Sequence, residues 1–213
     1  MPHFNILIAC DQKYYDDWGK TLLETTFLRN SWLAGSLHCH IVNPDENDRL
    51  PYVNYSFETR EFASEESRIS YLQSARFLAV ADKISDEDFF ITLDADTICT
   101  RDFDECEFQE IFDNINVLKH RKAGHWLAGF VTFNSVKFAK EYASELLSEP
   151  IEEWQIGRDQ IILDQLSKRY DFKELSHVWM SYGKSIRESA FFTLKGNQKT
   201  SDKYLYLYER FLL

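Results

Sequence analysis

The stretch Phe89-Phe90-Ile91-Thr92-Leu93-Asp94-Ala95-Asp96 decides the fold class of this chain. Its first five residues are a strongly apolar run, which is typical of a strand buried on both faces of a parallel sheet. Two carboxylates follow at the carboxyl end, where open α/β sheets bind their ligands. A Mg²⁺ or Mn²⁺ ion held by one or two carboxylates usually completes its shell with substrate phosphates and water. The spacing therefore indicates a metal–diphosphate site at the end of a buried strand.

Strand-like and helical patterns alternate on both sides of this stretch. The expected strands cover residues 4–10, 37–42, 54–62, 89–93, 115–119, 126–133, 177–180 and 191–194, with 54–62 nearer an edge. The expected helices cover 16–30, 69–83, 108–112, 135–147 and 152–170, and an aromatic tail at 204–211 is expected to pack as a helix. Because β and α segments alternate before residue 100 and mix afterwards, we expect an α/β fold with a mixed, mainly parallel sheet.

Length, charge and composition limit the possible partners. A chain of 213 residues, 44% apolar and 15% aromatic, is long enough for one large α/β domain but short for two. The net charge of -11 argues against nucleic acid or an anionic membrane as the main partner, because both attract clustered Lys and Arg. No segment has the roughly eighteen apolar residues of a membrane span, and no secretory signal precedes the first strand. A cytoplasmic protein is expected, with its four cysteines reduced and no disulfides.

Four further segments extend the pattern around the acidic stretch. The first is Ala9-Cys10-Asp11-Gln12-Lys13-Tyr14, at the end of the first strand, and the second is the helix that carries Arg76 before the acidic strand. The third is a later strand with the sequence "WLAGFVTFN" (126–134), and the fourth is the start of a helix with the sequence "GRDQIILDQL" (157–166). With "FFITLDADTI" (89–98), their order and spacing make the chain resemble the GT-A glycosyltransferases, particularly the small glycogenin-like and bacterial galactosyltransferase-like members. The resemblance spans most of the chain and implies a single GT-A (Rossmann-like) domain over residues 1–213. Its nucleotide-binding part would cover about residues 1–100 and its acceptor-side part about 101–213.

This resemblance implies a metal-dependent glycosyltransferase of the hexosyl type. Such an enzyme moves a sugar from a nucleotide-diphosphate sugar, here a UDP-sugar, to a glycan or another hydroxyl acceptor, with Mn²⁺ (or Mg²⁺) as cofactor. The positions that match the nucleotide and donor site are Ala9, Asp11, Tyr14, Arg76, Asp94, Ala95, Lys195, Gly196 and Lys199. The remaining matches are the metal ligands Asp94 and Asp96, the acceptor and sugar side Ala128, Gly129 and Gln160, and the catalytic positions Asp159 and Arg76.

Several of these residues also have a purely structural explanation. Arg76 lies beside a largely apolar helix face, so its guanidinium needs an anionic partner unless the side chain reaches out to solvent. That partner is the substrate, an Asp of the motif, or the carboxylate of a purely structural salt bridge. Asp159 caps its helix, deprotonates the acceptor in an inverting enzyme, or holds donor-sugar hydroxyls in a retaining one. Ala128 and Gly129 either leave room for sugar or serve strand packing. Asp94 binds metal, ribose or both, because residues two apart in a strand point the same way about 6.5 Å apart.

One position departs from the glycogenin-like pattern. That pattern has a late His as a further metal ligand, followed by a Gly and a Lys that meets the diphosphate, whereas "FFTLKGNQK" (191–199) places Thr193 where the His is expected. Water can fill the vacant position, since Mg²⁺ and Mn²⁺ sites commonly keep several waters. Lys195 and Lys199 are either phosphate contacts or solvated loop residues.

Two other classes compete with the transferase. "FFITLDADTI" also fits the opening motif of haloacid-dehalogenase-type phosphatases, with Asp94 as nucleophile and Asp96 as acid–base. That motif normally sits on the first strand, whereas about ninety residues precede it here, and no later apolar strand ends in a second acidic pair. The other alternative is a non-catalytic sugar-binding domain, because a fold does not prove an activity.

Overall fold

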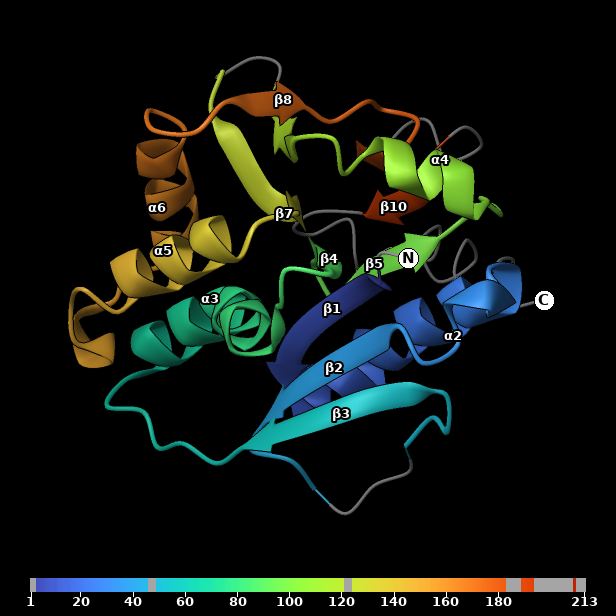
Figure 1. Ribbon diagram of the computed structural model, residues 1–213. Helices are drawn as coiled ribbons and strands as arrows, with labels where there is room; N and C mark the ends of the chain where they lie inside the picture. Colours follow the sequence, from blue (N-terminus) through green and yellow to red (C-terminus); the bar gives the residue numbers. More distant parts are fainter. Residues whose placement is uncertain (1–2, 46–48, 121–123, 183–188, 194–208, 210–213) are drawn as a thin grey trace.

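A seven-stranded sheet lies at the centre of the computed structural model, which describes residues 3–45, 49–120, 124–182, 189–193 and Glu209 (Figure 1). The strand order is β3-β2-β1-β4-β7-β6-β8, and β7 alone runs antiparallel to its neighbours. The strands are β1 (His3–Asp11), β2 (Leu37–Val42), β3 (Val53–Glu58), β4 (Asp88–Leu93), β6 (Ile115–Lys119), β7 (Trp126–Phe133) and β8 (Phe172–Glu174). The predicted mixed, mainly parallel sheet is confirmed, and β3 lies at its edge as expected.

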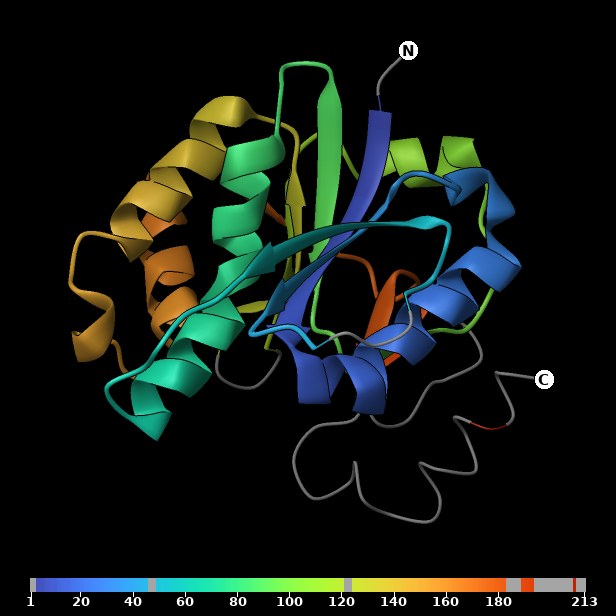
Figure 2. The same cartoon turned by 90° about the horizontal axis from the view of Figure 1, so that it is seen from below.

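Helices cover both faces of this sheet. Those described are α1 (Gln12–Tyr14), α2 (Lys20–Arg29), α3 (Glu65–Lys83), α4 (Glu105–Glu110), α5 (Val136–Leu146) and α6 (Arg158–Leu166), with the shorter turns η1 (Tyr15–Gly19), η2 (Ser31–Leu33) and η3 (Ile151–Glu153). Figure 2 shows α3, α5 and α6 (teal, gold and orange) on one side of the sheet and α2 and α4 (blue and light green) on the other. No helix in the described part of the chain is long and apolar enough to span a membrane.

The central strand β1 contributes to both halves of the core because its side chains alternate between the two faces. Ile6 and Ile8 belong to the half that contains the residues of α2 and α4. Leu7 and Ala9 belong to the half that contains those of α3, α5 and α6. Burial on both faces leaves only the strand ends for polar chemistry, so β1 and β4 present their functional side chains at their carboxyl ends.

A second, three-stranded sheet lies beside the end of β4. Its order is β5 (Thr97–Cys99), β10 (Phe191–Thr193) and β9 (Met180–Tyr182), with β10 antiparallel to β5 and parallel to β9. The pairing sets Thr193 opposite Thr97, one residue after the Asp-x-Asp motif. Segments almost a hundred residues apart in sequence therefore meet at the acidic end of β4.

Several boundaries differ from those expected. The predicted helix 152–170 is wrong as one element, because Gly157 has a left-handed φ of 86° and separates η3 from α6. The predicted helix 16–30 begins instead with α1 and with η1, a π-helical turn. α3 begins at Glu65 rather than 69 because Ser64 and Ser67 form a capping box there. The strands β5 and β8 are too short to be found from the sequence pattern, and the tail 204–211 lies outside the described residues except for Glu209.

Candidate functional site

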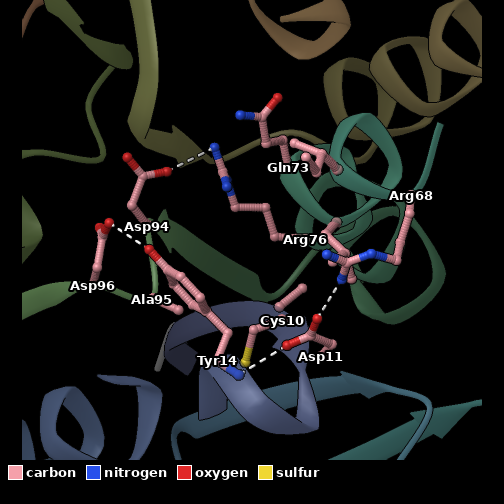
Figure 3. Close-up of a pocket in the computed structure, with 12 residues that line it drawn as sticks. Cys10, Asp11, Tyr14, Arg68, Gln73, Arg76, Asp94, Ala95 and Asp96 are labelled. Carbon is pink, nitrogen blue, oxygen red and sulfur yellow. Dashed lines mark hydrogen bonds and ion pairs between the residues drawn. The ribbon is translucent and has the colours of Figure 1, made fainter. Parts of the chain in front are cut away.

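A pocket of about 430 Å³ opens at the carboxyl ends of β1 and β4 (Figure 3). From β1 the chain continues to β2 and β3 on one side, while β4 lies on the other, so the pocket lies at a topological switch point. Its walls come from the end of β1, from α1, from one face of α3 and from the turn after β4. The lining residues are Ala9, Cys10, Asp11, Tyr14, Arg68, Ile69, Leu72, Gln73, Arg76, Asp94, Ala95 and Asp96.

Asp11 organises the β1 side of the pocket. Its Oδ1 accepts a hydrogen bond from the Tyr14 main-chain N–H at 2.8 Å, which caps α1. Its Oδ2 accepts from the guanidinium of Arg68 at 2.5 Å, and Arg68 also donates to Glu65 at 2.6 and 2.7 Å. The hydrogen bonds to Glu65 and then to Asp11 raise the pKa of Arg68 above its ordinary value, although burial opposes this. Both carboxylate oxygens of Asp11 are thus engaged by the protein.

Arg68 is a pocket residue that the sequence interpretation missed. It lies on α3 with Leu72 and Arg76, and all three line the pocket. Their spacing of i, i+4 and i+8 is the helical stripe that was available in the sequence. The signal was overlooked because Arg68 falls just before the predicted start of the helix at residue 69.

Arg76 lies at the junction between the two acidic groups of the site. Its side chain is only 5% exposed, and one terminal nitrogen lies 3.1 Å from Asp94 Oδ1 and 3.3 Å from Asp159 Oδ2. The same nitrogen donates to the main-chain oxygen of Ala128 at 3.0 Å. A buried guanidinium requires such partners. Of the open alternatives, the structure places Arg76 in an ion pair with an Asp of the motif.

Asp96 lies on the other side of the pocket and is 6% exposed. Its Oδ2 accepts from the Tyr14 hydroxyl at 2.7 Å, and its Oδ1 accepts from the Thr193 hydroxyl at 3.2 Å. The Thr193 hydroxyl is also 3.1 Å from the main-chain oxygen of Asp96. The chain turns immediately after β4, since the Thr97 main-chain N–H donates to the main-chain oxygen of Asp94 at 3.2 Å. This turn brings the two carboxylates of the motif to one pocket.

The donor set fits a hard divalent cation that shares its shell with a ligand. The carboxylates of Asp94 and Asp96 supply hard oxygen ligands, which suit Mg²⁺ or Mn²⁺, and the hydroxyls of Tyr14 and Thr193 donate hydrogen bonds to Asp96. Among the described residues, no group of three or more His, Cys, Asp or Glu side chains is arranged to hold a metal. These residues therefore fit a cation that takes its remaining ligands from water and phosphate.

The residues predicted on the acceptor side meet the pocket through Arg76. Asp159 lies in the first turn of α6 and its Oδ1 accepts from the Gln160 N–H at 2.8 Å, while Gly157 is the N-cap residue. Asp159 is therefore not the N-cap residue itself, but one of its oxygens engages an N–H of the first turn of α6 while the other faces Arg76. Gln160 Oε1 accepts from the Ala128 N–H at 3.2 Å, and its Nε2 is buried with no partner among the described residues. The main-chain oxygen of Gly129, in β7, accepts from the Asp94 N–H at 3.1 Å. This hydrogen bond holds the start of the turn after β4 against β7.

Most of the predicted site residues are brought together. Those that line the pocket itself are Ala9, Asp11, Tyr14, Arg76, Asp94, Ala95 and Asp96. Those connected to it by hydrogen bonds or ion pairs are Ala128, Gly129, Asp159 and Gln160. Thr193, at the position where the glycogenin-like pattern has a His, contacts Asp96. Lys195, Gly196 and Lys199 lie outside the described residues.

The strand order, the helices on both faces and the pocket at the switch point define a GT-A type of Rossmann-like fold. Among solved structures, 238 chains match. One of them is the crystal structure of the galactosyltransferase LgtC in complex with donor and acceptor sugar analogues, with a TM-score of 0.62 over 97% of this chain and 93% of that chain. At 16% sequence identity, this likeness shows the fold. No protein-family model and no curated protein matches the sequence.

Proposed function

We propose that the chain is a metal-dependent glycosyltransferase of the hexosyl type. It would move a sugar from a nucleotide-diphosphate sugar, a UDP-sugar by resemblance, to a hydroxyl of a glycan or other acceptor. The observation that carries this proposal is the position of Arg76. Its guanidinium lies between Asp94 at the pocket and Asp159 at the start of α6, in a fold shared with a galactosyltransferase. One side chain thus connects the proposed metal end to the proposed reacting sugar.

The charge of the pocket supports the participation of a cation. Its lining contains the carboxylates of Asp11, Asp94 and Asp96 but only the two guanidiniums of Arg68 and Arg76. Glu65 and Asp159, which pair with these arginines, add further negative charge. A diphosphate brought into this surplus of carboxylates is repelled unless a cation accompanies it. When bound by Asp94 and Asp96, a Mn²⁺ or Mg²⁺ ion would act as a Lewis acid that stabilises the negative charge of the leaving diphosphate.

The other pocket residues have distinct parts in donor binding under this proposal. Asp11 and Tyr14 lie at the nucleotide end, and Ala9 and Ala95 are small enough to leave space for it. Lys195, Gly196 and Lys199 remain proposed diphosphate contacts on the resemblance alone.

Asp159 is proposed to hold hydroxyls of the donor sugar. Its side chain is 8% exposed and paired with Arg76, which holds the carboxylate in place as an acceptor for sugar hydroxyls. The buried, unpartnered Nε2 of Gln160 is a further donor beside it, and leaving such a group unsatisfied costs roughly 1–3 kcal/mol. A sugar hydroxyl placed there would satisfy it. Ala128 and Gly129 would leave room for that sugar on β7.

The phosphatase alternative is not favoured by the geometry. Its nucleophile would be Asp94, whose Oδ1 is engaged by Arg76, and the motif lies at the end of β4 rather than of the first strand. A simple phosphomonoester hydrolysis assay separates the two classes.

The proposal is tested by donor turnover. The protein is incubated with a panel of UDP-sugars and Mn²⁺, and released UDP is measured beside phosphate released from a simple phosphomonoester. A transferase releases UDP from a preferred donor, and this release is lost with EDTA and in Asp94→Asn/Asp96→Asn. Phosphate release without UDP release would assign the protein to the phosphatases, and neither activity would favour a non-catalytic sugar-binding domain.

A further inference from the structure

Tyr142, on α5, is a fully buried tyrosine that does not line the pocket. α5 packs against both α3, which carries Arg76, and α6, which carries Asp159 (Figure 1). The Tyr142 hydroxyl donates a hydrogen bond of 2.6 Å to the main-chain oxygen of Asp159. Tyr142 thus connects α5 directly to the residue proposed to hold the donor sugar.

The same side chain also supports the ion-pair partner of Asp159. The centroid of the Tyr142 ring lies 4.4 Å from that of the Phe77 ring. The central guanidinium carbon of Arg76 lies 4.7 Å from the centroid of Phe77. Arg76 and Asp159 in turn form their ion pair at 3.3 Å. Tyr142 therefore contacts Asp159 directly and Arg76 through Phe77, so it helps to set the spacing of the pair.

The hydrogen bond from Tyr142 is well suited to positioning. Burial, and then the negative charge of Asp159, raise the pKa of Tyr142 well above its ordinary value, although the charge of Arg76 opposes this. The phenol therefore stays protonated and donates. Because the main-chain oxygen of a helical residue also accepts from the N–H four residues later, this contact is not needed to form α6. What it adds is a fixed position for the first turn of the helix.

A second contact between α5 and α6 lies one residue earlier. The Nε of Arg158 donates to the main-chain oxygen of Leu146, in the last turn of α5, at 3.0 Å. Of these two connections, only that of Tyr142 falls on Asp159 itself. The side chain of Asp159 is oriented by the Gln160 N–H and by Arg76, so the backbone position that Tyr142 helps to set determines where its carboxylate lies.

We propose that Tyr142 is a positioning residue for sugar transfer, an inference that rests on the proposed function. Its hydroxyl and its ring hold Asp159 and the Phe77–Arg76 contact at one spacing, and this spacing places the Asp159 carboxylate against the hydroxyls of the donor sugar. Loss of the hydroxyl therefore affects the sugar end of the pocket and leaves the nucleotide end unchanged.

The first experiment compares Tyr142→Phe with wild type. This change keeps the ring against Phe77 and removes only the hydroxyl. The kcat for UDP release from the preferred UDP-sugar with Mn²⁺ falls roughly tenfold, as expected when a lost hydrogen bond lets a substrate-holding group move from its best geometry. The affinity for UDP with Mn²⁺, measured by calorimetry, stays at the wild-type value because UDP carries no sugar for Asp159 to hold.

Tyr71→Phe is the matched control. Tyr71 is also buried, does not line the pocket, and donates from its hydroxyl to Glu58 at 2.6 Å. Both variants lose one hydrogen bond of a buried phenol, and urea unfolding establishes that both are folded. The kcat of Tyr71→Phe stays at the wild-type value. An equal fall in kcat in the two variants would assign the effect to a general loosening of the core and overturn the inference.

A double-mutant cycle with Asp159→Asn tests whether Tyr142 acts through Asp159. Asp159→Asn keeps the main-chain oxygen and removes the charge that pairs with Arg76. If Tyr142 acts through that carboxylate, adding Tyr142→Phe to Asp159→Asn lowers kcat no further. Independent losses that multiply, or an unchanged kcat in Tyr142→Phe, overturn the inference while the proposed function stands. If wild type releases UDP from no donor, the proposed function fails and the inference with it.

Discussion

At the scale of single residues, the site depends on buried charges that compensate one another. Arg76 is surrounded by Asp94, Asp159 and the oxygen of Ala128, and Asp96 is buried under two hydroxyl groups. Asp96 is therefore not the solvent-facing ligand that a motif at a strand end suggests. Its substitution is best made with Asn, which keeps the shape of the side chain and one accepting oxygen while removing the negative charge.

Removing the Arg76 guanidinium is expected to affect both activity and stability. Arg76→Met leaves Asp94 and Asp159 without their shared partner, so the free energy of unfolding falls by roughly 3 kcal/mol, as for other broken buried ion pairs. Donor turnover falls at least about a hundredfold, since both proposed donor contacts lose their position. Urea unfolding and UDP-release kinetics measure the two effects.

The matched control is Arg68→Met, in the same helix. The Arg68 side chain is 34% exposed, so its ion pairs with Asp11 and Glu65 are expected to contribute only about 1 kcal/mol or less. Equal destabilisation by the two substitutions would contradict the central position assigned to Arg76.

At the scale of elements, short segments and turns place the site. The left-handed Gly157 starts α6 so that Asp159 faces Arg76, and three-residue strands place Thr193 beside Asp96. The sequence pattern predicted the long strands and helices because burial imposes a regular period over many residues. It indicated β10, as 191–194, and a strand at 177–180 that overlaps the start of β9, but it gave no sign of β5 and so did not reveal that the three strands form a separate sheet. It missed the break at Gly157 because the apolar spacing continues on either side.

The backbone at Gly157 is expected to matter for activity. Gly157→Ala has open space for its Cβ but forces a left-handed φ of 86° on alanine, which costs about 1–2 kcal/mol per residue. Relief of that strain shifts the start of α6 and Asp159 with it. Thermal unfolding and UDP release from the preferred donor are measured together, and both are lower than in wild type.

Gly35→Ala provides the control for strain alone. Gly35 has a similar φ of 81° and equally open space, but it precedes β2, at the end of the strand opposite the pocket. It is expected to lower stability by a similar amount and to leave turnover unchanged. Equal loss of turnover in both variants would show that α6 has no special part in the reaction.

At the scale of the whole molecule, the fold class was predictable and the long-range contacts of the site were not. Alternating β and α patterns and the acidic end of β4 sufficed for the sheet and for the position of the pocket. The contacts of Arg76 with Asp159, and of Thr193 with Asp96, join positions 83 and 97 residues apart. Such contacts leave no local signal in a single sequence.

The stability of the folded molecule is expected to fall in mild acid because of His38. Burial, followed by the charge of Lys83, lowers the pKa of His38 from 6.5 to about 4. Between these values the unfolded chain binds a proton that the folded chain does not, so stability is lost as the pH falls from about 6.5 towards 4, by at most about 3 kcal/mol. Urea unfolding at pH 7 and pH 5 measures the change.

The comparison with His38→Asn separates the contribution of His38 to the pH dependence of stability from that of the carboxylates and the other histidines. The variant loses the titrating group, so its decrease in stability between the two pH values is smaller than that of wild type. An equal decrease would show that His38 accepts a proton in the folded protein as readily as in the unfolded chain.

The measurement that tests the central claim most directly is calorimetric titration with UDP, GDP and CMP, each with and without Mn²⁺. The control is Asp94→Asn/Asp96→Asn, shown to be folded by circular dichroism. A metal-dependent glycosyltransferase binds one of these nucleotides, UDP by our proposal, only when Mn²⁺ is present, and the double variant loses this binding. Absence of nucleotide binding, or UDP binding that is unchanged without Mn²⁺ and in the double variant, would contradict the proposed function.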